Sequence, residues 1–160
     1  IGRLVAEKLK PFGPRIIVSD PYVRDAGDYE LVSKESLLAQ SDVVTLHVRS
    51  NCAVIGPEEF AKMKVHSYLI NSARSYLVDR DALFAALDSG KLLGAAIDVF
   101  ETEPNIPQQY LKYDNVTLTS HRGGDTINSY KDAPLFAMKN WLGYKAGGEL
   151  RFFVNKNNLQ

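Results

Sequence analysis

The chain has few of the features that would place it outside the cell, on a nucleic acid or in a membrane. It contains one cysteine, Cys52, so it cannot form an internal disulfide, which favours a reducing, cytoplasmic location. Its 19 basic and 19 acidic residues cancel, which removes the electrostatic reason to expect a nucleic-acid partner. No apolar run approaches the roughly 18 residues that a membrane-spanning helix requires, so we expect no membrane partner.

Other signals are missing as well. The sequence begins at Ile1 instead of a methionine and runs directly into a helical pattern, so we expect it to be truncated at its N-terminus. Gly2 heads the first expected helix, but no strand and no pair of glycines precede it. No cysteine and histidine spacing is typical of a zinc site, and we expect no bound metal.

What is present is an alternation of helical and strand-like segments. Apolar residues at helical spacing, with Ser33 and Asp79 as caps, predict helices, and short β-branched runs predict strands. This alternation predicts an α/β fold with a mainly parallel sheet, and 160 residues favour one domain. The expected helices cover residues 2–12, 33–40, 58–64, 79–89 and 126–144, and the expected strands cover residues 15–20, 42–47, 68–71, 93–100, 116–119 and 151–154.

Polar side chains follow most of the expected strands. They are Asp20, His47, Asn71–Arg74, Asp98–Glu103 and Ser120–His121. Because parallel strands bring their carboxyl ends to one rim, and open α/β sheets bind ligands there, we expect these residues to gather around one ligand. The pattern predicts a nucleotide- or phosphate-type ligand and does not identify a reaction.

Two residues have the chemistry of a dinucleotide site. Asp20, at the end of a strand, can accept hydrogen bonds from ribose hydroxyls and would repel the 2′-phosphate of NADP. A simple turn at Asp20-Pro21 explains the same spacing equally well. Gly2 would be the third glycine of a phosphate-binding motif, where it lets a helix pack closely against a strand, although most single glycines are turn residues.

Three residues have the chemistry of acid–base catalysis on a carboxylate. Arg74 follows a strand, and a guanidinium binds a carboxylate through two hydrogen bonds, although a surface ion pair is the commoner role. Glu103 and His121 follow two successive strands, and a carboxylate beside an imidazole allows proton transfer near neutral pH. An acidic turn at Glu103 and a partly buried structural histidine at His121 are the alternatives.

Taken together, these segments resemble the D-isomer-specific 2-hydroxyacid dehydrogenases. The most specific blocks are N-S-A-R at 71–74, D-V-F-x-x-E-P at 98–104 and S-H at 120–121, in this order. The resemblance extends from Ile1 to about Trp141. It implies hydride transfer between NAD and a D-2-hydroxy or 2-keto acid, with His121 as proton donor, Glu103 orienting it and Arg74 holding the substrate carboxylate.

The resemblance also implies a fold and a cofactor site. The fold would be a Rossmann-like, doubly wound, mainly parallel sheet that lacks its first strand and the second, substrate domain. Residues 1–149 would form an NAD-binding domain, incomplete at its N-terminus, and residues 150–160 a segment returning toward the missing domain. The residues expected at the cofactor, with Asp98 at the nicotinamide amide, are Ile1, Gly2, Asp20, His47, Val48, Ser72, Ala73, Arg74, Asp98, His121, Gly123 and Gly124.

The sequence departs from the family at a few positions. Arg49 stands where a proline is usual, Ser75 and Tyr76 follow Arg74 in place of a glycine and a small or branched residue, and Arg122 replaces a smaller apolar residue. These changes leave the exact substrate open, but not the fold.

The sequence and the resemblance leave three interpretations open. The first is a cytoplasmic, homodimeric NAD-dependent oxidoreductase, of which the present 160-residue piece would have little turnover of its own. The second is a non-catalytic NAD-sensing module similar to the corepressors of this superfamily, which can retain the same three residues. The third is a degraded or truncated gene product with no function of its own.

Overall fold

Parallel strands form the framework of the chain, which we describe from a computed structural model. The structure describes residues 1–149, so the expected strand at 151–154 and the segment 150–160 lie outside the described residues. The chain divides into two compact units, residues 1–122 and a second unit that begins at Gly123, and each is described by itself.

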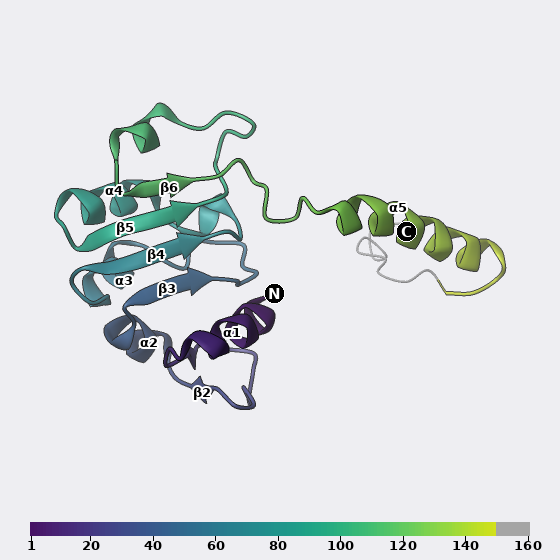
Figure 1. Cartoon of the computed structure of the whole chain (residues 1–160), viewed down its shortest axis with the longest axis horizontal. Coiled ribbons are helices and arrows are strands. Elements are labelled where there is room, and N and C mark those ends of the chain that lie inside the picture. Colours follow the sequence, from purple (N-terminus) through teal and green to yellow (C-terminus); the bar gives the residue numbers. More distant parts are fainter. Residues whose placement is uncertain (150–160) are drawn as a thin grey trace. The chain divides into compact units, whose positions relative to one another are not determined.

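The first unit contains two parallel sheets. The larger has the order β3-β4-β5-β6, formed by Val43–Leu46, Ser67–Asn71, Leu92–Ile97 and Val116–Leu118 (Figure 1). All three strand pairs of this sheet are parallel, as the alternating pattern predicts. A smaller sheet pairs β1 (Ile17–Val18) with β2 (Glu30–Leu31), and β2 was not expected because two residues are too few to show a pattern.

Helices connect these strands, and two of them begin at the predicted capping residues Ser33 and Asp79. The Ser33 side chain accepts a hydrogen bond from the N–H of Ser36, and the Asp79 side chain accepts one from the N–H of Ala82. The α-helices of this unit are α1 (Gly2–Leu9), α2 (Lys34–Gln40), α3 (Pro57–Lys62) and α4 (Arg80–Asp88). Three short 3-10 helices, η1 (Lys10–Phe12), η2 (Ser75–Leu77) and η3 (Gln108–Lys112), complete the unit.

The core lies on one face of the larger sheet. Leu38 of α2, Phe60 of α3 and Leu83 of α4 are buried in one cluster with Val44 and Leu69 of the strands. Such burial of apolar surface supplies most of the favourable free energy of folding.

The opposite face of the sheet corrects one expectation. In the sequence Val43, Val44 and Leu46 run almost without alternation, which predicts a buried strand of a parallel sheet. In the structure Val43 is 51% exposed, while Val44 and Leu46 are buried. Tyr68 and Leu93 are exposed as well. The reason is that neighbouring side chains of a strand point to opposite faces of the sheet, and only one face of the larger sheet packs against the core.

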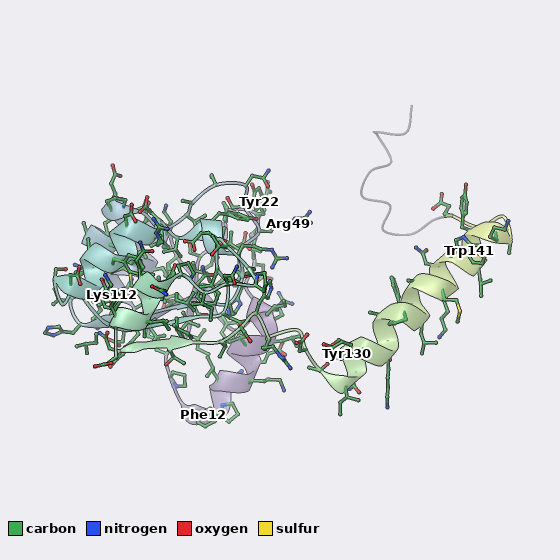
Figure 2. The ribbon with its side chains drawn as sticks, turned by 90° about the horizontal axis from the view of Figure 1, so that it is seen from above. Phe12, Tyr22, Arg49, Lys112, Tyr130 and Trp141 are labelled. Carbon is green, nitrogen blue, oxygen red and sulfur yellow. The ribbon has the colours of Figure 1, made fainter. Side chains whose placement is uncertain are left out.

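The second unit contains the long helix predicted at its position, α5 (Ile127–Lys145). Its N-cap is Thr126, whose side-chain oxygen accepts a hydrogen bond from the N–H of Ser129 at 3.0 Å. Pro134 lies inside the helix, and Tyr130 and Trp141 are labelled along it in Figure 2.

A close approach between β5 and the segment before β6 depends on one glycine. A Cβ atom added at Gly94 would lie 2.5 Å from the carbonyl oxygen of Asn115 and 3.4 Å from the ring of Tyr68. The oxygen belongs to the backbone, and the N–H of Ala95 donates a hydrogen bond to it. Any side chain at position 94 would therefore displace the start of β6.

Gly94→Ala tests this approach. We expect it to lower the free energy of unfolding by about 1–3 kcal/mol, because the added methyl group forces a backbone shift. Gly143→Ala is the control, since among residues 1–149 no atom beyond its neighbours and its own helix backbone lies within 4 Å of the added Cβ, and alanine favours the helix by up to about 1 kcal/mol. Denaturant unfolding of both variants measures the difference, and equal stabilities would contradict the close approach.

Candidate active site

The predicted site residues gather at the carboxyl edge of the larger sheet. His47 follows β3 directly, Ser72 to Arg74 follow β4, and Asp98 follows β5. His121 lies three residues beyond β6. Because the four strands are parallel, their carboxyl ends lie along one edge, which is where the sequence pattern placed these residues.

Glu103 and His121 form the central contact of this edge. The Nδ1 atom of His121 lies 2.8 Å from Oε2 of Glu103, and Oε1 of Glu103 accepts a hydrogen bond from the N–H of Phe100 at 2.9 Å. The hydrogen bond with His121 is the main reason that the pKa of Glu103 is lowered, and the Phe100 N–H and the charge of Arg74 lower it further. The carboxylate thus stays ionised and holds one side of the imidazole.

The backbone at His121 is held in an uncommon conformation. Its φ angle is 55°, in the left-handed region that few residues other than glycine adopt. The buried side chain of Asp98 forms hydrogen bonds with residues on both sides of His121. Its Oδ1 atom accepts one from the Thr119 hydroxyl and one from the backbone N–H of Arg122. Sequence reasoning expected Asp98 at the cofactor, but gave no signal of this contact.

Arg74 is presented by a short loop that Asn71 organises. The buried Asn71 side chain donates to the carbonyl of Arg74 at 2.9 Å and accepts from the N–H of Ala73 at 3.1 Å. The Arg74 guanidinium donates to the carbonyl of Ala73 and is exposed. Within the described chain no hydrogen bond joins it to Glu103 or His121, although its charge acts on Glu103.

The start of α1 approaches the end of β3. Ile1 is the N-cap, and a Cβ added at Gly2 would lie 3.2 Å from Cβ of His47. Glycine at this position therefore permits the close helix–sheet packing expected from the third glycine of a dinucleotide motif. His47 is half-buried, and burial lowers its pKa, while Val48 beyond it is exposed.

Asp20 and the glycines Gly123 and Gly124 lie on other segments of the chain. Asp20 lies two residues beyond β1, its Oδ1 accepts from the N–H of Tyr22 at 2.9 Å, and the side chain remains exposed. Gly123 and Gly124 belong to the second unit, where the carbonyl of Gly124 accepts a hydrogen bond from Ser129.

These residues fit a dinucleotide. The exposed Asp20 carboxylate is a suitable acceptor for a pair of ribose hydroxyls, and the N–H groups at the start of a helix favour an anionic phosphate. Gly2 leaves no side chain between that helix and the end of β3. The donor and acceptor types present therefore match the cofactor that the resemblance implies.

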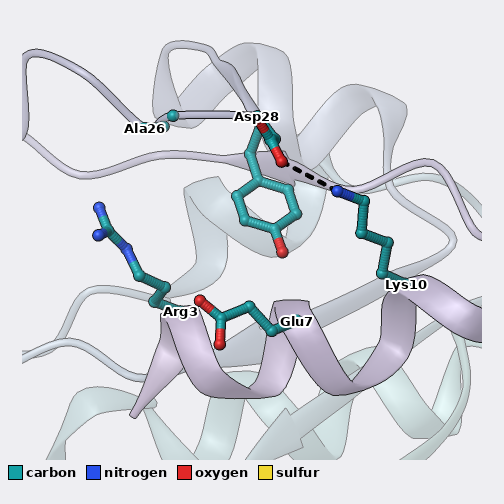
Figure 3. A pocket seen from close by; sticks show the side chains of 7 residues that line it. Arg3, Glu7, Lys10, Ala26 and Asp28 are labelled. Atoms are coloured by element: carbon teal, nitrogen blue, oxygen red, sulfur yellow. Dashed lines mark hydrogen bonds and ion pairs between the residues drawn. The ribbon is translucent and has the colours of Figure 1, made fainter.

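A cavity elsewhere in the first unit is separate from this edge. It has a volume of about 280 Å³ and lies between α1 and the segment Ala26–Tyr29, where Lys10 and Asp28 form an ion pair at 2.9 Å (Figure 3). None of the predicted site residues lines it.

Arg49, at the position where proline is usual, is exposed and labelled in Figure 2. None of the helices between residues 1 and 149 has the length and apolar character that crossing a bilayer would require.

Comparison with known proteins agrees with the arrangement of these elements. Residues 1–123 match the family described as "D-isomer specific 2-hydroxyacid dehydrogenase, NAD binding domain". The chain is 40% identical to 4-methyl-2-oxopentanoate reductase A of Aspergillus oryzae, over 88% of this chain and 44% of that protein. It is 34% identical to a glyoxylate reductase of Thermococcus litoralis, over 99% of this chain and 50% of that protein.

A solved structure has the same fold. The crystal structure of a glyoxylate reductase from Paecilomyes thermophila matches with a TM-score of 0.88 and 35% identity, over 94% of this chain and 48% of that one. The Rossmann-like, parallel fold expected from the sequence is thereby confirmed. The chain spans about half the length of the relatives it matches here. It belongs to the D-isomer specific 2-hydroxyacid dehydrogenase family and carries that family's NAD binding domain.

Proposed function

We propose that this chain is part of an NAD-dependent oxidoreductase that transfers hydride between NAD and a D-2-hydroxy or 2-keto acid. The observation that carries the proposal is the 2.8 Å contact between His121 and Glu103, with the charge of Arg74 acting on the same carboxylate. The names of the relatives support it, because 4-methyl-2-oxopentanoate and glyoxylate are both 2-oxo acids.

The three residues divide the chemistry of keto-acid reduction between them. Arg74 binds the substrate carboxylate, and its positive charge polarises the adjacent keto group. Glu103 holds Nδ1 of His121, so Nε2 is directed to the keto oxygen and donates its proton there. Bound NADH supplies the hydride to C2, and the product is a 2-hydroxy acid. In the oxidation direction Nε2 accepts the same proton.

The cofactor contacts are part of the proposal. Asp20 binds the adenosine ribose and selects NAD over NADP, Gly2 allows the pyrophosphate close to α1, and Asp98 faces the nicotinamide amide. The remaining cofactor-lining residues that we propose in the first unit are Ile1, His47, Val48, Ser72, Ala73, Arg74 and His121. We assign residues 1–149 to this domain, and the similarity that covers 94% of the chain supports that extent.

Location and assembly complete the proposal. The exposed, free thiol of Cys52 favours a reducing compartment, and we propose the cytoplasm. We propose a homodimer on the basis of the family resemblance. The alternative, a non-catalytic NAD-sensing module, has no support from the relatives, whose names are those of enzymes.

His121→Gln tests the proton-transfer role in the intact protein. We expect NADH oxidation with a panel of 2-keto acids to fall about 10²–10⁴-fold, while the Kd for NAD stays nearly unchanged. His66→Gln is a matched control, because His66 also has a left-handed backbone (φ 66°) but lies before β4, at the amino ends of the strands. Full activity of His121→Gln would exclude the assignment.

Glu103→Gln tests the electrostatic role through pH. Reduction needs a protonated ring, which an ionised carboxylate stabilises, so loss of the Glu103 charge should lower kcat/KM about tenfold or more and change its dependence on pH. Because the pKa of Glu103 is lowered, the parent pair should also stay intact to lower pH than an ordinary glutamate would allow. A pH profile that does not change in the variant would argue against the pairing.

Arg74→Ala separates substrate binding from cofactor binding. We expect a loss of about 10²-fold or more in kcat/KM for keto acids, because a charged hydrogen-bonding partner of the substrate is removed. Fluorescence titration should show a much smaller loss of NADH affinity, because the other cofactor-lining residues remain in the variant. A variant that loses NADH affinity and keeps its keto-acid KM would reverse the proposed assignment.

A further inference from the structure

An aromatic group lies between α4 and the segment that carries Glu103. The Tyr110 ring of η3 packs edge-on against Phe84 of α4, with ring centroids 5.0 Å apart, and against Phe100, with ring centroids 5.4 Å apart. Phe84 also stacks with Tyr113 at 5.4 Å, and the Tyr113 hydroxyl donates to Asp88 of α4 at 3.0 Å. We call Phe84, Phe100, Tyr110 and Tyr113 the aromatic group.

The turn that follows Phe100 has little anchorage of its own. Residues 101–105 are exposed, and the hydrogen bonds between Thr102 and Asn105 close the turn on itself without joining it to the core. Phe100 at the start of the turn is only 5% exposed, and Ile106 at its end packs against the core. The position of the turn thus depends largely on the packing of Phe100 in the core.

Phe100 connects the aromatic group to the proton-transfer pair. Its ring contacts Tyr110, and its backbone N–H donates to Oε1 of Glu103 at 2.9 Å. The other oxygen of that carboxylate meets Nδ1 of His121 at 2.8 Å. Movement of Phe100 would therefore move the carboxylate relative to the imidazole, which is held separately by the loop around Asp98.

We propose that Tyr110 is a positioning residue for the Glu103–His121 pair. Its ring is 4% exposed and is fixed by Phe84 on α4, so it provides a rigid surface against which Phe100 is seated. The Tyr110 hydroxyl lies 3.5 Å from Glu101, at the limit of a hydrogen bond, so the ring and not the hydroxyl carries this role. Tyr110 acts through Phe100 and Glu103 and does not itself contact the reacting atoms.

The proposed effect is large for a residue outside the site because hydrogen bonds depend steeply on distance and angle. A shift of about 1 Å in the turn would take the Glu103–His121 contact out of the range of a good hydrogen bond. Misplacement of that size in a catalytic group can cost about 10²-fold in rate. The inference rests on the proposed function for its kinetic consequence, but its geometry can be tested without turnover.

The experiment compares three variants of the intact protein. Tyr110→Ala removes the ring that contacts Phe100, Tyr110→Phe keeps the ring, and Tyr113→Ala removes a ring that contacts Phe84 alone within the aromatic group. Tyr113→Ala is therefore matched for the loss of an aromatic contact with α4. All three are read by NMR titration of the Glu103 carboxyl group, assigned by its loss in Glu103→Gln, and by the pH profile of keto-acid reduction.

We expect Tyr110→Ala to raise the midpoint of the Glu103 carboxyl titration toward that of His121→Gln, because the hydrogen bond with His121 is the main cause of the lowered pKa of Glu103. The kcat for keto acids should fall about tenfold or more, with the KM and the Kd for NADH nearly unchanged. Tyr110→Phe and Tyr113→Ala should both match the parent in titration midpoint and pH profile, even where Tyr113→Ala lowers the melting temperature.

A parent-like midpoint in Tyr110→Ala, or an equal shift in Tyr113→Ala, would overturn the inference. If Tyr110→Ala does not fold, Tyr110→Leu replaces it, since leucine retains apolar volume and lacks the ring edge, and the same criteria apply. Absence of keto-acid reduction in the parent would defeat the proposed function instead, and the NMR titration would still decide whether Tyr110 positions the pair.

Discussion

Parallel hydrogen bonding between β5 and β6 sets the positions of both members of the Glu103–His121 pair. Ile97 pairs with Leu118, so the two strands end side by side, and the turn with Glu103 and the loop with His121 leave from neighbouring points. Asp98 connects the segments that follow the two strands, because it comes directly after β5 and accepts hydrogen bonds from Thr119 and Arg122, which follow β6. A change in strand register would separate the pair before any side chain was altered.

The two sides of the pair are held by different kinds of interaction. The His121 side is held by polar contacts to a buried carboxylate and by a backbone conformation that few residues adopt. The Glu103 side is held by a backbone N–H and by the packing of rings. Arg74 reaches the same edge from β4, on a loop organised by Asn71. Three neighbouring strands thus contribute one functional group each.

Sequence reasoning succeeded where the signal was local. The caps at Ser33 and Asp79, the strands before His47 and Asn71 and the long helix after Thr126 follow from residue type and spacing, and the structure has them. The catalytic assignment came from the resemblance, because spacing alone left a surface ion pair open for Arg74, an acidic turn for Glu103 and a structural histidine for His121. The strand β2, the exposure of Val43 and the contact of Tyr110 with Phe100 depend on tertiary packing, for which a single sequence carries no pattern.

The exposure of the Glu103–His121 pair has a consequence for its strength. The side chains of His121 and Glu103 are 44% and 37% exposed, so they interact in a high-dielectric environment and are screened by dissolved ions. A bound molecule that covers this edge would remove water from around the carboxylate and the ring, and would strengthen the contact without moving an atom of either residue. The contact is therefore weak while the edge is open to water and stronger once the edge is covered.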